Sequence, residues 1–154
     1  MFRDLSALFA FLHHLAAFAL VAALALEFVL IKGELDARAA RRLQLTDLVF
    51  GMTSGVVLVV GLLRVFYFEK GASYYLHSAP FIAKLVLFLA VGLLSIVPTM
   101  EFLSWRKALR QGQTPSLDAG KLRKLRAVMH LELVGVVLIL LCAVLMARGV
   151  GHFG

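Results

Sequence analysis

Residues 5–31 read LSALFAFLHHLAAFALVAALALEFVLI, an apolar run interrupted by one serine, two histidines and one glutamate. A helix that crosses a bilayer needs about 20 mostly apolar residues, so we expect one membrane-spanning helix from Ser6 to Ile31. Three further stretches meet the same requirement: residues 45–68, 80–105 and 127–147. None shows the alternating segments of about 10 residues that are typical of a membrane β-barrel. The sequence therefore predicts an all-α fold, a four-helix transmembrane bundle in up-down-up-down order.

The composition agrees with this class of protein. The chain has 154 residues, of which 62% are hydrophobic and 16% charged. Soluble domains average about 45–50% apolar and roughly 25% charged residues, and disordered chains are poor in apolar residues. Cys142 is the only cysteine, which excludes an internal disulfide scaffold. The length suggests a single transmembrane domain over residues 1–154.

The basic residues predict how the bundle is oriented. Eleven of the 16 lie in the first and third connections: Lys32, Arg38, Arg41, Arg42, Arg106, Lys107, Arg110, Lys121, Arg123, Lys124 and Arg126. Four lie toward the other side, namely Arg3, Arg64, Lys70 and Arg148, and Lys84 lies inside the third span. Basic loops stay cytoplasmic, so we expect both termini on the outer, periplasmic side of a bacterial inner membrane. The net charge of +7 indicates topology and lipid headgroup contact. No stacking aromatics accompany the basic loops, which argues against a nucleic-acid partner.

Ionisable residues inside a bilayer are costly and usually functional, and four of them form an outer layer. At a rise of about 1.5 Å per residue, His13 lies roughly 10 Å and Lys84 roughly 6 Å below the outer ends of their helices. His14 and Arg64 lie at similar depths. With no carboxylate expected in this layer, the cluster suits an anion or a metal-bound macrocycle. Imidazole is a common axial ligand of haem iron, a buried lysine can supply a neutral amine, and Arg64 can pair with a propionate.

Simpler interpretations of the outer layer remain open. An intramembrane histidine can bond to a neighbouring helix, and Lys84 and Arg64 can extend to the headgroups. Adjacent residues on a helix differ by about 100°, so at most one of His13 and His14 points inward. The aromatic residues Phe66, Tyr67, Phe68, Tyr74 and Tyr75 are typical of an interfacial belt.

A second, inner layer holds Glu27, Asp47, Glu101, His130 and Glu132. One interpretation is interhelical salt bridges with the cationic loops. The other is a proton path through Glu27, Glu101, His130 and Glu132, since such side chains relay protons in membranes. We also expect an inward stripe on the first helix that ends at Glu27, a packing face at Gly51 and Gly55, and a kink at Pro98.

Several of these segments resemble known families. Residues 12–17, LHHLAA, are similar to the first-helix motif of HemJ-type protoporphyrinogen oxidases and of copper-resistance D-type membrane proteins, and residues 80–88, PFIAKLVLF, to the HemJ third-helix lysine motif. Residues 124–146 resemble the last helix. The chain as a whole resembles a family of small bacterial four-helix membrane proteins with no assigned function, and residues 64–71, RVFYFEKG, with the Tyr74–Tyr75 pair are particular to it.

The resemblance implies b-type haem with His13 and Lys84 as its iron ligands, and His14 as a substitute for His13. His130 and Glu132 stand where HemJ-type proteins carry an asparagine–glutamate pattern, which puts the oxidase activity in doubt more than haem binding. We therefore expect a redox role, either porphyrinogen oxidation or electron transfer with a quinone. Whether the protein is itself an enzyme stays open.

Two other functions stay open. The chain can be a non-catalytic subunit of a larger membrane complex or a homo-oligomer, or it can transport copper or another metal. Copper(I) prefers sulfur ligands, and Met52, Met100, Met129 and Met146 form no recognisable cluster in the sequence.

Overall fold

The computed structural model of the chain describes residues 2–69 and 71–153, so Lys70 lies outside the described residues. Four long helices form the molecule: α1 (Phe2–Leu30), α2 (Ala37–Leu63), α4 (Ala79–Ser104) and α6 (Ala119–Ala147). A π-helical turn, η1 (Arg64–Phe68), extends α2, and α3 (Ala72–Leu76) and α5 (Arg106–Arg110) are short. Each long helix is long and apolar enough to cross a membrane. This confirms an all-α, multi-pass membrane protein.

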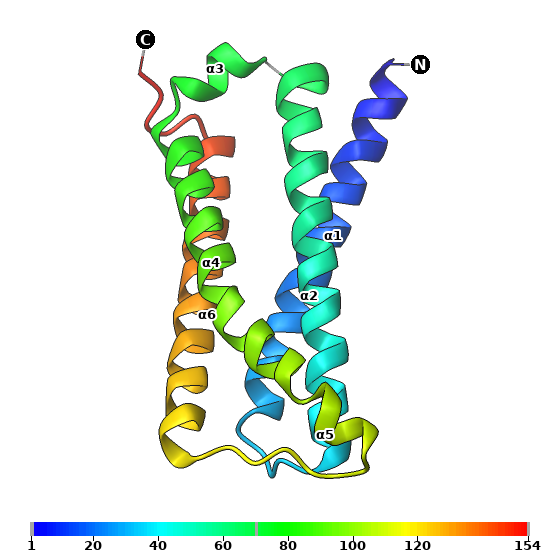
Figure 1. Cartoon of the computed structure of the whole chain (residues 1–154). Helices are drawn as coiled ribbons and strands as arrows, with labels where there is room; N and C mark the ends of the chain where they lie inside the picture. The colour runs from blue at the N-terminus through cyan, green and yellow to red at the C-terminus, as the bar shows by residue number, and fades with distance from the viewer. Residues whose placement is uncertain (1, 70, 154) are drawn as a thin grey trace.

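The long helices form two antiparallel pairs. α1 packs along α2 and α4 packs along α6, with far fewer contacts between the pairs. Both chain termini and α3 lie at one end, which we call the terminal end (Figure 1). The two basic connections and α5 lie at the other, which we call the basic end. In Figure 1 the pairs diverge toward the terminal end and converge at the basic end.

Two helices begin earlier than the apolar runs indicate. α2 begins at Ala37 and α6 at Ala119, rather than at residues 45 and 127. The Asp36 carboxylate accepts a hydrogen bond from the Ala39 amide (2.6 Å), and the Asp118 carboxylate accepts one from the Lys121 amide (2.8 Å). Such N-caps start a helix regardless of hydropathy. The added turns carry seven of the eleven basic residues of the first and third connections. Hydropathy therefore marks the expected bilayer boundary rather than the helix start.

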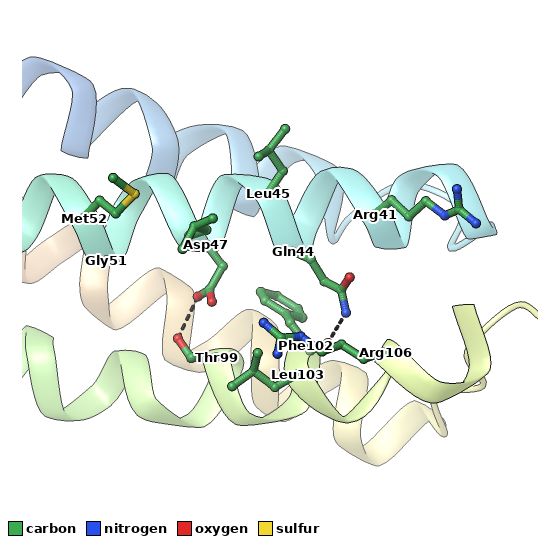
Figure 2. Close-up of a pocket in the computed structure, with 11 residues that line it drawn as sticks. Arg41, Gln44, Leu45, Asp47, Gly51, Met52, Thr99, Phe102, Leu103 and Arg106 are labelled. Atoms are coloured by element: carbon green, nitrogen blue, oxygen red, sulfur yellow. Dashed lines mark hydrogen bonds between the residues drawn. The ribbon is translucent and has the colours of Figure 1, made fainter. Parts of the chain in front are cut away.

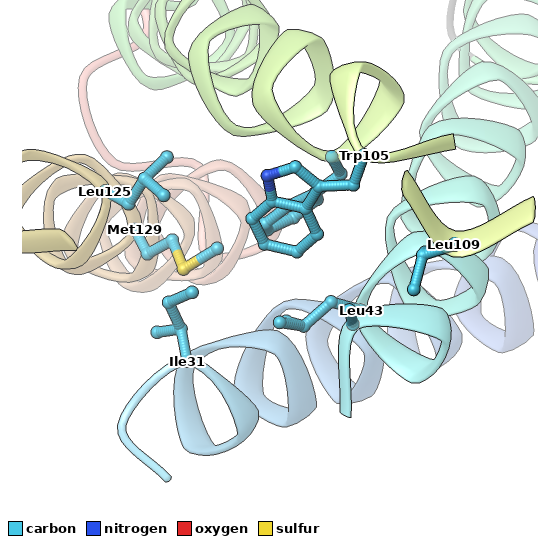
Figure 3. Packing of buried hydrophobic residues seen from close by; sticks show 8 residues of the cluster. Ile31, Leu43, Trp105, Leu109, Leu125 and Met129 are labelled. Carbon is cyan, nitrogen blue, oxygen red and sulfur yellow. The ribbon is translucent and has the colours of Figure 1, made fainter. Parts of the chain in front are cut away.

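The convergence at the basic end is held by a hydrophobic cluster (Figure 3). Its buried members come from both pairs and from α5: Ile31, Ala40, Leu43, Phe102, Trp105, Leu109, Leu125 and Met129. A second cluster lies midway along the bundle and comprises Leu20, Ala23, Leu24, Phe50, Val91 and Val136. Leu20, Leu24 and Glu27 are all buried, which confirms the inward stripe of α1.

Glycine allows close helix packing at a position that was not predicted, Gly135, and does not do so at the predicted face of Gly51 and Gly55. A Cβ at Gly135 would lie 2.5 Å from Val91 Cγ2, so α6 approaches α4 through a bare Cα. By contrast, a Cβ at Gly51 or Gly55 would meet no described atom within 4 Å. The predicted Gly51–Gly55 face is therefore not used for packing within the described part of this chain.

Pro98 lies buried within α4, which continues to Ser104. α4 changes direction in its half nearer the basic end, passing from the side of α6 toward α2 (Figure 1). A proline removes one backbone hydrogen bond and bends a helix, in agreement with the expected kink.

Candidate functional site

A cavity of about 170 Å³ separates the two helix pairs toward the terminal end. His13 and His14 of α1 line one side, and Lys84 and Phe88 of α4 line the other. The remaining lining is apolar and includes Val57 of α2 and Ile139 and Leu140 of α6. The structure therefore brings together three of the four predicted outer-layer residues, from opposite helix pairs.

The two histidines differ in their surroundings. His13 is half-buried, its Nδ1 is buried without a hydrogen-bond partner, and the backbone of Val57 is its neighbour on α2. A Cβ at Gly61 would lie 3.0 Å from His13 Cε1, so a side chain there would require the ring to shift by a few tenths of an ångström. His14 is exposed, and its Nδ1 donates to the carbonyl of Ala10 (2.6 Å). His13 is thus the inward histidine, as the spacing requires of one of the two.

Lys84 is half-buried on the opposite wall. Its Nζ lies 5.5 Å from the centroid of the Phe81 ring, a distance at which the ring face attracts a cation. Arg64, His13 and Cys142 are its polar neighbours. Among the described residues, no carboxylate forms a salt bridge with Lys84. The amine therefore faces the cavity without a counter-ion.

Arg64 has a protein partner that the sequence interpretation did not assign. Its Nη2 donates to Glu69 Oε1 at 2.5 Å, while its Nε is buried without a partner. The expectation that this layer contains no carboxylate is wrong. The π-helical turn of residues 64–68 ends at Glu69, whose amide donates to the Arg64 carbonyl, and this turn brings the two side chains together. Single π-helical turns are rare in proteins, and those that occur often lie at functional sites. Hydropathy carries no signal for them.

Tyr75 also departs from the expected aromatic belt. It is buried, and its ring packs on Phe81 with centroids 5.2 Å apart. Burial, and next the negative charge of Glu69, raise the pKa of the Tyr75 phenol. Phe66 and Tyr67 are exposed and suit the interfacial belt.

The inner layer divides into two groups. Glu27, Asp47 and Glu132 are buried and within electrostatic reach of one another. Glu101 instead lies at the basic end, where Trp105 Nε1 donates to it (3.1 Å) and Lys121 Nζ lies 3.7 Å away. His130 is exposed beside the Phe28 ring. The structure thus adds Asp47 to two of the predicted path residues and separates Glu101 and His130 from them.

Two further spaces adjoin this arrangement. A cavity of about 250 Å³ lies between the helix pairs and shares Ala17, Val57, Phe88, Ile139 and Leu140 with the histidine cavity. A larger groove of about 660 Å³ runs between α2 and α4 toward the basic end, with Asp47 and Thr99 in its wall (Figure 2). The interior of the bundle therefore offers space from the histidines toward the inner layer.

Comparison with known proteins assigns the chain to a family. Residues 5–151 match DUF2214, described as a predicted membrane protein. The chain belongs to the DUF2214 family. No curated protein and no solved structure matches it. The family covers all four long helices, so both the histidine cavity and the buried carboxylates lie within the DUF2214 region.

Few of the described side chains of this DUF2214 protein are placed to bind a metal. Within residues 2–69 and 71–153, no three histidine, cysteine or acidic side chains converge as ligands of a bare metal ion. The histidine cavity instead has two nitrogen-bearing side chains, His13 and Lys84, on opposite walls.

Proposed function

We propose that this DUF2214 protein binds b-type haem between its helix pairs and serves membrane redox chemistry. One observation carries the proposal. His13 of α1 and Lys84 of α4 line one cavity from opposite helix pairs, and His13 Nδ1 has no hydrogen-bond partner in its buried position. His13 Nδ1 lies on the side of Gly61 and the Val57 backbone of α2, so the other ring nitrogen, Nε2, is the donor that we propose for the iron.

The side chains of the histidine cavity have the chemistry to bind haem. The cavity is large enough for haem only if the two helix pairs move apart. Pockets for ligands of drug size take about 300–1,000 Å³, more than the 170 Å³ of this cavity. The adjoining cavity of 250 Å³ extends the space along the interface between the pairs. Because contacts between the pairs are few, we expect them to separate toward the terminal end when the macrocycle enters.

The chain would contribute ligands, shielding and orientation. His13 and Lys84 would hold the iron, with His14 as the nearest substitute for His13. Arg64 would orient a haem propionate. Because Arg64 already pairs with Glu69, its interaction with the propionate would be weakened. Bound haem would supply one-electron redox chemistry. The resemblance to HemJ-type proteins supports porphyrinogen oxidation, with a porphyrin substrate. The alternative is electron transfer, for which a membrane quinone would be the partner. In either case we propose a bacterial inner membrane, with the basic end in the cytoplasm.

Visible spectra of the purified protein, oxidised and then reduced with dithionite, test this function. We expect a Soret band, and an α-band of b type after reduction. His13→Ala and Lys84→Ala should each lower the Soret absorbance per protein strongly, whereas His14→Ala, on the exposed neighbour, should lower it little. A colourless protein from cells supplied with haem would refute the proposal. A full Soret band in both His13→Ala and Lys84→Ala would refute the ligand assignment alone.

A second function has one specific observation in its favour. Gly51 and Gly55 form an exposed face of α2 that meets no described atom of this chain within 4 Å of their ideal Cβ positions. Small residues let a second helix approach closely in a membrane, so this face suits a non-catalytic subunit or a homo-oligomer. Gly55→Leu, at a position that lines neither cavity between the helix pairs, should dissociate such a complex in mild detergent and leave the Soret band unchanged. Copper transport gains no comparable support, since Met52 and Met100 are both exposed.

A further inference from the structure

Three carboxyl groups are buried inside the bundle, away from the histidine cavity. Glu27 comes from α1, Asp47 from α2 and Glu132 from α6, and they are 1%, 8% and 1% exposed. The electrostatic influence of Asp47 reaches both glutamates, and that of Glu132 reaches Glu27. We call these three residues the carboxyl cluster.

Two members of the carboxyl cluster have oxygens without partners. Asp47 Oδ1 accepts a hydrogen bond from Thr99 Oγ1 of α4 (2.7 Å). Glu27 Oε1 and both carboxyl oxygens of Glu132 are buried and have no hydrogen-bond partner. Since buried polar atoms are normally bonded, these oxygens indicate a ligand that the protein atoms do not supply.

No cation of the surrounding helices neutralises the carboxyl cluster within the described residues. Arg126 of α6 donates to the carbonyls of Ile31 and Lys32, and Arg41 of α2 donates to the carbonyl of Leu109. On α4, the titratable residue nearest in sequence to Thr99 is Glu101. Its carboxylate accepts a hydrogen bond from Trp105 and lies near Lys121. Arg41 and Arg126 are therefore engaged with backbone carbonyls, and Lys121 is engaged with Glu101.

The missing ligand is most simply a proton. An unpaired buried carboxylate is so costly that it takes up a proton instead. A metal ion would need several converging ligands, and no group of three histidine, cysteine or acidic side chains among the described residues is arranged to hold one. Protonation removes the charge, and a protonated carboxyl group can donate as well as accept a hydrogen bond.

Asp47 connects the carboxyl cluster to the basic end. It lies in the wall of the groove between α2 and α4, together with Arg41, Gln44 and Arg106 (Figure 2). Glu27 and Glu132 do not line this groove. Water that enters the groove would reach Asp47 first.

We infer that Glu27, Asp47 and Glu132 form a proton-exchange site, which opens through the α2–α4 groove to the basic end with Asp47 as its entry residue. A hydronium ion in the groove gives its proton to the Asp47 carboxylate and leaves as water. The Asp47 carboxyl then passes this proton to whichever of Glu27 and Glu132 is ionised and becomes a carboxylate again. The reverse steps return a proton from the glutamate through Asp47 to water, with no change in oxidation state. This site does not depend on haem binding.

Labelling with an apolar carbodiimide tests the site. The reagent adds to a protonated carboxyl in an apolar environment, and mass spectrometry of the full-length protein in mild detergent locates the adduct. We expect adducts on Glu27 and Glu132 that decrease severalfold as the pH is raised, and little on Glu101, the matched control. Glu27→Gln and Glu132→Gln should each lose one adduct while keeping the wild-type circular dichroism and gel-filtration profile.

Other outcomes would overturn the inference. Labelling of Glu101 equal to that of Glu27 and Glu132, or labelling of neither glutamate at any pH, would contradict a buried protonated pair. Protection of the two glutamates by millimolar Na⁺, Ca²⁺ or Mn²⁺ would identify a cation site instead.

A pH jump followed by infrared spectroscopy tests the entry role of Asp47. The carbonyl stretch of protonated carboxyls reports exchange at Glu27 and Glu132. Asp47→Asn should slow this exchange severalfold, and Glu101→Gln should leave it unchanged. An unchanged rate in Asp47→Asn would show that protons reach the carboxyl cluster by another route.

Discussion

Gly61 and His13 meet where α2 passes α1, and the fit between them is close. Because a Cβ at Gly61 would lie 3.0 Å from His13 Cε1, Gly61→Ala should displace the imidazole. Overpacking of this kind costs about 1–3 kcal/mol, so we expect about a tenfold loss of haem affinity. Haem titration followed at the Soret band measures it. Gly55→Ala is the matched control, because nothing lies within 4 Å there, and equal affinities of the two variants would contradict the role of Gly61.

Tyr75 predicts a dependence on alkaline pH. Burial, followed by the charge of Glu69, raises the phenol pKa above its ordinary value of 10, so the folded protein favours the neutral phenol. The resulting stability is present below pH 10 and is lost as the pH rises through the raised pKa. Tyr75→Phe should abolish this alkaline loss of stability and the latest phase of tyrosinate absorbance. Identical alkaline titrations of both proteins would contradict the prediction.

At this scale the sequence revealed residue types and depth but not partners. His13 and Lys84 could be singled out because ionisable residues within an apolar run are unusual. Glu69 could not be assigned to Arg64, because their contact depends on the π-helical turn between them. Asp47 was visible in the inner layer, yet only helix packing shows that it joins Glu27 and Glu132.

At the scale of the helices, α4 and α6 approach each other closely at Gly135. A Cβ there would lie 2.5 Å from Val91 Cγ2, so Gly135→Ala should force the helices apart and destabilise the protein by about 1–3 kcal/mol. Thermal unfolding in detergent measures the change. Gly92→Ala, where a Cβ meets no described atom within 4 Å, should cost little. Adding Val91→Ala to Gly135→Ala should recover part of the loss, and no recovery would show that the clash is not with Val91.

Helix number and order could be predicted because an apolar run of about 20 residues has few other uses. The starts of α2 and α6 could not be taken from hydropathy, because their first turns are basic. Asp36 and Asp118 were the available signal, since aspartate is a favoured N-cap. The short helices α3 and α5 lie in connections where hydropathy is uninformative.

Over the whole molecule, the pairing of helices decides where ligands can enter. Lipid tails are as apolar as leucine, so helix pairing depends on close packing rather than on hydrophobicity, and composition could not predict that α4 pairs with α6. The hydrophobic cluster of Figure 3 joins the pairs at the basic end. This join at the basic end agrees with the proposed separation of the pairs toward the terminal end, near His13, and with the proposed proton exchange near Asp47.

The orientation of the whole molecule gives the last prediction. The two basic connections lie at one end, and basic loops are retained in the cytoplasm. In a Cys142→Ser background, Ser116→Cys marks the basic end and Ser73→Cys the terminal end, both at exposed serines. A membrane-impermeant maleimide added to intact spheroplasts should label Ser73→Cys and not Ser116→Cys, and inverted vesicles should give the opposite result. The reverse pattern would place Asp47 and its groove on the outer side, so that the carboxyl cluster would exchange protons with the periplasm.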